Sequence, residues 1–120
     1  MMSFENLEVW KKSCALAVKI YAILKDCRDF GLKEQMLRSA VSIPSNIAEG
    51  NERNSRQEYK RFLNIAKGSA AELRTQIYIS QKIKIIPEAE AKNLISELIS
   101  ISKMLQALHD SLTKKLITDN

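Results

Sequence analysis

Apolar side chains recur at alternating steps of three and four residues along almost the whole chain, and no other feature constrains the fold as strongly. Residues at these steps lie on one side of an α-helix and form a stripe that must be buried. Four stripes with short connections predict an all-α, antiparallel up-and-down four-helix bundle in one domain, residues 1–120. The expected helices span about 6–26, 32–49, 55–84 and 87–116.

The four stripes also fit the composition, because three glycines and two prolines are too few for the many turns of an all-β fold. Ser55 and Glu58 are spaced as in a capping box and predict the start of the third helix, and Pro87 suits the first turn of the fourth. In chain order, the stripes consist of Leu7, Trp10, Cys14, Ala17, Tyr21 and Leu24; Met36, Ala40, Ile43 and Ile47; Tyr59, Phe62, Ala66, Ala70, Leu73 and Ile77; and Leu94, Leu98, Ile101, Leu105, Leu108 and Leu112.

The second stripe contains a proline and is followed by a glycine. Pro44 lacks the N–H that would bond the carbonyl of Ala40, and its ring crowds that turn. Because the apolar spacing resumes in phase at Ile47, we expect Pro44 to kink the helix rather than end it. Gly50 is predicted to end the helix in the left-handed conformation that glycine adopts without strain. The residues around Asp29 are expected to connect the first two helices.

The positive charge of the chain is concentrated in one segment. The formal net charge is +5, yet residues 53–84 hold 8 basic and 2 acidic side chains, residues 1–52 hold 7 of each, and residues 85–120 hold 4 basic and 5 acidic. A basic stripe on the third helix favours salt-sensitive, sequence-tolerant binding of nucleic acid. The alternative is a solvated face that pairs with acids of a neighbouring helix. The candidate nucleic-acid-binding residues are Arg53, Arg56, Lys60, Arg61, Lys67 and Arg74.

Polar ridges run beside the second and third apolar stripes. If the two ridges meet, Arg38 could pair with Glu49 or Glu72 in a partly buried network that fixes helix register, while Gly68 would let another backbone approach. The alternative is two solvated faces. The candidate network consists of Arg38, Ser42, Asn46, Glu49, Ser69 and Glu72.

The third and fourth helices carry more apolar surface than one bundle core requires. This surplus fits either a wide core face or an interface between subunits. Tyr59, Phe62 and Tyr78 are expected in a core or an interface rather than as platforms for stacked bases. The surplus residues are Ile65, Ile79, Ile95 and Ile99.

Residues that could support catalysis are sparse. His109 is the only histidine, and its neighbour Asp110 is expected to point to a different part of the helix surface. Phosphate-binding glycine loops are absent from the sequence, and Cys14 and Cys27 lack the spacing of a zinc or redox motif. We therefore expect no catalytic residue, metal or cofactor. The cysteine usage and the lack of a leader pattern or of 18 consecutive apolar residues favour a cytoplasmic protein that does not enter membranes.

Several motifs together resemble the four-helix bundle family that is also called the 23S ribosomal RNA intervening-sequence protein family. The resemblance covers the chain up to about residue 80, and the last helix matches only in pattern. The motifs are Phe4-x-x-Leu7-x-Val9-Trp10, Ile20-Tyr21, Gly31-Leu32-x-x-Gln35-x-x-Arg38, Ser42-Ile43-Pro44-x-Asn46-Ile47-Ala48-Glu49-Gly50, Arg53 and Ala66-x-Gly68-Ser69-x-x-Glu72-Leu73.

The resemblance implies an up-and-down bundle that assembles as a homopentamer, with members encoded in intervening sequences of ribosomal RNA genes. A related protein, the accessory variability determinant of diversity-generating retroelements, implies nucleic acid and a reverse transcriptase as partners. The motif residues, Gly68 and Arg53 among them, imply architectural rather than catalytic roles. Our hypothesis is a non-enzymatic oligomeric bundle that binds RNA or DNA, and the alternative is a scaffold that holds a partner protein through apolar patches.

Overall fold

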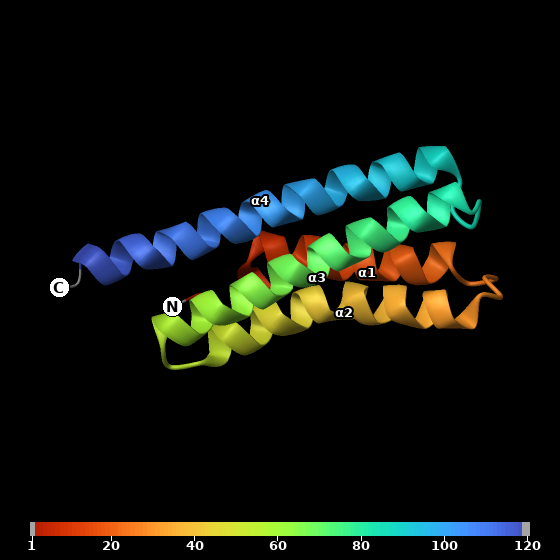
Figure 1. The fold of residues 1–120 in the computed structure, drawn as a ribbon. Coiled ribbons are helices and arrows are strands. Elements are labelled where there is room, and N and C mark those ends of the chain that lie inside the picture. Colours follow the sequence, from red (N-terminus) through yellow and green to blue (C-terminus); the bar gives the residue numbers. More distant parts are fainter. Residues whose placement is uncertain (1, 119–120) are drawn as a thin grey trace.

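The computed structural model describes the backbone of residues 2–118 and the side chains of residues 2–114, and this part of the chain is helical with no strand (Figure 1). This confirms the predicted all-α fold. None of the helices in the described part is long and apolar enough to cross a membrane. The elements are a 3-10 turn at Phe4–Asn6, α1 at Glu8–Ile23, α2 at Phe30–Glu52, α3 at Arg56–Lys82 and α4 at Glu88–Thr118.

The four helices form an elongated up-and-down bundle of 52 × 21 × 20 Å. Each helix packs against its neighbour in the chain, and α1 also packs against α4, which closes the ring of contacts. Figure 1 shows the successive helices running in opposite directions and the C-terminal part of α4 extending beyond α1. The most extensive helix contacts are those of α3 with α2 and with α4, and the contact of α1 with α4 is the smallest of the four.

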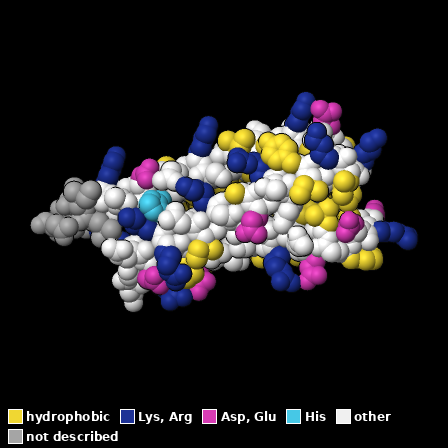
Figure 2. Space-filling model, in the orientation of Figure 1, with side chains coloured by type: hydrophobic (Ala, Val, Ile, Leu, Met, Phe, Trp, Pro, Cys, Tyr) yellow, Lys and Arg dark blue, Asp and Glu magenta, His cyan; other side chains and the backbone are white. Residues whose placement is uncertain are grey.

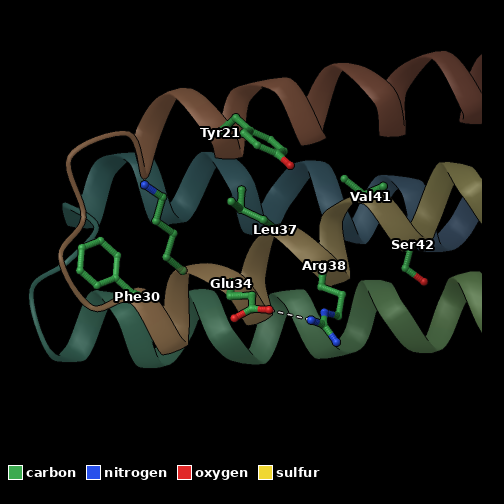
Figure 3. Close-up of a pocket in the computed structure, with 8 residues that line it drawn as sticks. Tyr21, Phe30, Glu34, Leu37, Arg38, Val41 and Ser42 are labelled. Carbon is green, nitrogen blue, oxygen red and sulfur yellow. Dashed lines mark hydrogen bonds and ion pairs between the residues drawn. The ribbon is translucent and has the colours of Figure 1, made fainter.

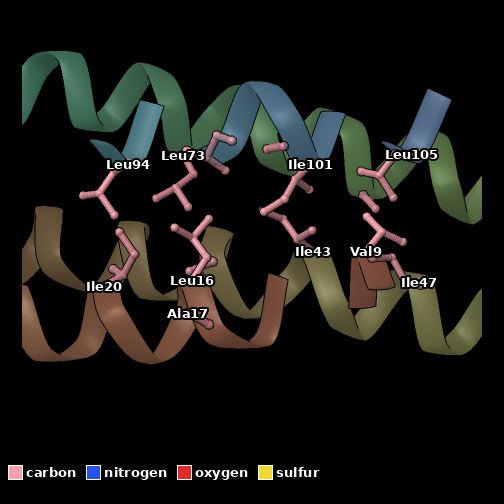
Figure 4. Close-up of a cluster of buried hydrophobic side chains, with 14 of the residues drawn as sticks. Val9, Leu16, Ala17, Ile20, Ile43, Ile47, Leu73, Leu94, Ile101 and Leu105 are labelled. Carbon is pink, nitrogen blue, oxygen red and sulfur yellow. The ribbon is translucent and has the colours of Figure 1, made fainter. Parts of the chain in front are cut away.

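The core runs along the axis of the bundle and is built mainly from the predicted stripes. All predicted stripe residues of α2 and α3 are buried, and on α4 only Leu108 is partly exposed. Figure 4 shows side chains from opposite helices meeting in layers, for example Ile20 near Leu94 and Ile43 near Ile101. Burial of each such aliphatic side chain contributes about 1.5–3 kcal/mol, so on α2, α3 and α4 the apolar spacing specifies which face of the helix is buried.

The predicted stripe of α1 is confirmed only in part, because Ala17 and Leu24 are buried but the rest of the buried face is shifted by about one residue. Tyr21 is 53% exposed, whereas Val9, Ser13, Leu16 and Ile20 are buried. Ser13 tolerates this burial because its hydroxyl donates a hydrogen bond of 3.0 Å to a carbonyl of the preceding turn. Two stripes with the same spacing therefore lie side by side on α1. The core buries most of the stripe that contains Ser13 and only part of the predicted one.

Helix α2 continues through Pro44 and past the predicted end. Pro44 is buried inside the helix, as the in-phase spacing predicts. The prediction for Gly50 is wrong, because α2 extends to Glu52 and no glycine has a positive φ angle in the described residues. A Cβ atom at Gly50 would lie 2.7 Å from the Cβ of Phe62 and 3.1 Å from the ring of Tyr59. Glycine is thus required here for the close approach of α3.

Local capping fixes the other helix boundaries. Asp29 caps α2 by accepting a hydrogen bond of 3.1 Å from the N–H of Leu32, so the helix begins two residues earlier than predicted. Ser55 caps α3 as predicted, with a bond of 3.2 Å from the N–H of Glu58. The α3–α4 turn contains Lys84 at φ 64°, a left-handed residue placed where helices usually end in glycine.

Candidate nucleic-acid interface

The turn between α2 and α3 gathers three of the six candidate basic residues. The guanidinium carbon of Arg53 lies 5.0 Å from the centre of the Phe62 ring, and that of Arg61 lies 4.5 Å from it. Both arginines therefore stack on the same buried aromatic residue. Arg56, the first residue of α3, lines an open hollow of about 490 Å³ beside this turn.

Acidic residues on the same helices neutralise part of this cluster. Arg53 donates a hydrogen bond of 2.9 Å to Glu49, and Arg61 binds both carboxylate oxygens of Glu58, at 2.9 and 3.2 Å. The hydrogen bond from Arg61 lowers the pKa of Glu58, which favours the charged form of this acid. The net field at the α2–α3 turn is consequently smaller than the sequence count suggests.

The remaining candidates lie together on the flank of α3 that faces α4. Lys60, Lys67 and Arg74 are spaced by seven residues, or about 10.5 Å per step, and all three are half-buried. Lys67 donates a hydrogen bond to the neutral amide of Gln106, and among the described side chains no acid pairs with any of the three. We call Lys60, Lys67 and Arg74 the basic flank.

A polar chain on α4 borders the basic flank. The Nε2 atom of His109 lies 3.5 Å from the Asn64 amide nitrogen, and its Nδ1 atom lies 3.6 Å from the Asp110 carboxylate. This approach shows that the expectation that His109 and Asp110 point apart is wrong. Gln106 donates a hydrogen bond of 2.9 Å to the Asp110 carboxylate and holds it in this orientation. In Figure 2 the single histidine lies among basic side chains on the face that α3 and α4 form.

The two polar ridges meet, but through serines and an amide rather than through an ion pair. The hydroxyl groups of Ser42 and Ser69 lie 2.8 Å apart, and Asn46 donates bonds of 2.8 and 2.9 Å to the carbonyl and hydroxyl oxygens of Ser42. Ser69 is buried, so this chain of hydrogen bonds links α2 to α3 away from water. Ser42 and Asn46 lie two residues before and after Pro44, so their bonds brace the part of α2 that lacks a backbone hydrogen bond.

The charged candidates of the network take other partners. Arg38 binds Glu34 at 2.7 Å, one helical turn back on α2, and both side chains are exposed. Glu72 shares a hollow of about 300 Å³ with Arg38 but is exposed to solvent. Gly68 does not let a backbone approach within the chain, since nothing lies within 4 Å of the place its Cβ would occupy. Arg38 therefore contributes only a surface pair, and Glu72 forms no ion pair among the described residues.

An apolar hollow that the sequence did not predict lies on the outer side of α1 and α2. It has a volume of about 640 Å³, and Figure 3 shows Tyr21, Phe30, Leu37 and Val41 around it, next to the Glu34–Arg38 ion pair. Phe30 is 70% exposed and is the first residue of α2, whereas the sequence placed it in the connection around Asp29. In the sequence, Leu37 and Val41 each follow a residue of the apolar stripe by one position. These two apolar residues outside the stripe could have indicated this surface.

The fold and surface define an up-and-down four-helix bundle that presents a basic hairpin end and a basic flank. Its described residues contain no group of three or more histidine, cysteine or acidic side chains that could hold a metal ion. The chain belongs to the family described as 23S rRNA-intervening sequence protein, whose pattern matches residues 5–107. The family likeness inferred from the motifs is thereby confirmed.

Solved structures contain the same fold. The chain resembles, at a TM-score of 0.79 and 28% sequence identity, a protein of unknown function from the S23 ribosomal protein family of Bacteroides thetaiotaomicron. The match covers 84% of this chain and 97% of that one. The comparison with curated proteins found no match.

Proposed function

We propose that the protein is a non-enzymatic oligomeric bundle that binds RNA or DNA without sequence specificity. The observation that carries this proposal is the basic flank, in which three cations lie in a row without an acidic partner among the described residues. A half-buried cation beside apolar surface is poorly hydrated and gains more from a phosphate than a fully solvated one. Arg53, Arg56 and Arg61 extend the positive surface at the adjoining turn.

A homo-oligomer would strengthen the attraction by repeating the basic flank. The outer face of α3 supports self-association, because Ile65 and Ile79 are 40% and 49% exposed and Gly68 between them is open to a neighbouring backbone. The apolar hollow at Tyr21 is a second, different surface. Two different surfaces suit a head-to-tail contact that closes into a ring, and the family likeness favours a pentamer.

Binding is tested by fluorescence anisotropy with labelled 20-nucleotide RNA and DNA of mixed sequence between 50 and 200 mM salt. We expect comparable affinities for different sequences and a steep fall of affinity as salt rises. Undetectable binding at low salt, or an affinity that salt does not change, would refute the proposal.

Self-association is tested by light scattering. The chain has a mass of 13.6 kDa, so a pentamer would measure five times this value, about 68 kDa. Ile79→Glu should reduce the mass, whereas Ala107→Glu, at an exposed position of α4, should not. A wild-type mass near 13.6 kDa would exclude the ring.

The alternative is a scaffold that holds a partner protein, such as a reverse transcriptase, in the apolar hollow. The exposure of Phe30 and Tyr21 around that hollow favours it. A protein that binds no nucleic acid but loses a protein partner when Phe30 is replaced by glutamate would support this scaffold role instead.

A further inference from the structure

The basic flank continues into an exposed aromatic side chain. Tyr78 lies one helical turn beyond Arg74 on the same side of α3 and is 48% exposed. The sequence-based expectation placed this ring in a core or an interface, and its exposure shows that it is not part of the core of the chain. Of the three aromatic residues of α3, Tyr59 and Phe62 are buried, so Tyr78 alone presents its ring to a ligand.

The α4 side of this surface can be placed from two side-chain contacts. Asn64 meets His109 and Lys67 meets Gln106, so the antiparallel helices pair with residue numbers that add to 173. The same register sets Arg74 opposite Ile99 and Tyr78 opposite Ile95. Ile99 is 36% exposed and Ile95 packs against the core, so this register predicts apolar neighbours for Tyr78 on α4. Figure 2 shows hydrophobic side chains gathered towards this end of the molecule.

We propose that the α3–α4 face binds single-stranded nucleic acid, with its phosphates on the basic flank and one unpaired base stacked on Tyr78. This inference rests on the proposed nucleic-acid binding and adds the class of ligand. From Lys60 to Tyr78 the surface is 18 residues long, about 27 Å, and it combines a row of cations with one aromatic platform. Sequence-tolerant single-strand sites combine these same two elements.

A duplex would not use the aromatic platform. Its bases are stacked on one another and closed to a side chain on the surface of a helix, so a duplex could contact only the cations. The preference for single strands should therefore depend on Tyr78, while the salt-dependent part of binding should depend on Lys60, Lys67 and Arg74.

The test compares Tyr78→Ala, Tyr78→Phe and Val18→Ala for binding to oligouridine, oligothymidine and a mixed-sequence duplex at one salt concentration. Val18 is the control, because it is 71% exposed on α1, away from the basic flank and outside the apolar hollow. Tyr78→Ala should weaken single-strand binding about 5- to 150-fold, because one stacked base contributes about 1–3 kcal/mol. Tyr78→Phe should keep the wild-type affinity, and Val18→Ala should leave binding unchanged.

The outcomes separate the two proposals. If the wild-type protein binds single strands in a salt-dependent way and Tyr78→Ala binds equally well, the stacking site is wrong and the proposed function stands. If Tyr78→Ala instead lowers the oligomer mass in light scattering, Tyr78 belongs to an interface and the inference is overturned. If the wild-type protein binds neither single strands nor duplex at low salt, both proposals fail.

Discussion

Gly50 allows a sharp test of how α2 and α3 pack. The Cβ of an alanine at this position would lie 2.7 Å from the Cβ of Phe62, about 0.7 Å closer than the 3.4 Å at which ordinary contact begins. A Cβ atom is fixed to the backbone, so no rotamer change relieves the clash and one helix must move. Overpacking of this kind costs about 1–3 kcal/mol, and the higher helix propensity of alanine returns about 1 kcal/mol.

We therefore expect Gly50→Ala to lose up to about 2 kcal/mol of unfolding free energy and up to about 8 °C in Tm. Gly31→Ala is the matched control, because it lies near the other end of α2 and its Cβ would approach only the Asp29 carboxylate, at 3.9 Å. The unfolding free energy of this control should rise by about 0.5 kcal/mol. Urea unfolding followed by circular dichroism, at one protein concentration, measures the unfolding free energy of both variants. A Gly50→Ala protein as stable as Gly31→Ala would refute the packing.

Three further predictions concern single contacts. Lys84→Gly should raise the unfolding free energy by about 0.5–1 kcal/mol, measured by urea unfolding, because φ 64° strains a lysine but not a glycine. Ser42→Ala and Ser69→Ala should each lose about 1 kcal/mol, and the double variant should lose less than their sum in the same assay, because the two hydroxyls share one hydrogen bond. Burial raises the pKa of Tyr59, so the unfolded chain releases this proton first, and stability should fall as pH rises above about 10. Tyr59→Phe should flatten this fall in pH-dependent unfolding, and an identical fall in both proteins would assign it to other groups.

The fold follows largely from apolar spacing, and the exceptions have physical causes. On α2 and α3 a single stripe matches the core, whereas on α1 two stripes compete and the choice depends on tertiary packing and on a hydrogen bond that Ser13 can make. For Gly50, sequence alone does not distinguish a left-handed end from a close helix contact. The residue that it contacts, Phe62, is 12 positions away and is placed by the fold.

The candidate site is only partly encoded in local spacing. The distribution of charge along the chain indicated the basic segment. The spacings of Glu49 to Arg53 and Glu58 to Arg61 suit ion pairs on a helix, but the sequence-based expectation paired Glu49 with Arg38 instead. The separation of the basic flank from that turn, and the exposure of Tyr78 beside it, depend on where α4 packs. This position is set by contacts between distant residues, so a helix pattern does not predict it.

The salt dependence of binding tests the central claim most directly. Each phosphate neutralised on a single strand contributes about 0.7 to the slope of log affinity against log salt concentration, so replacing Lys60, Lys67 and Arg74 together by glutamine should lower the slope by about 2. Replacing Arg53 and Arg61 by glutamine should lower it by less than 1, because Glu49 and Glu58 already neutralise them. Equal slopes for the triple variant and the wild-type protein would contradict binding through the basic flank.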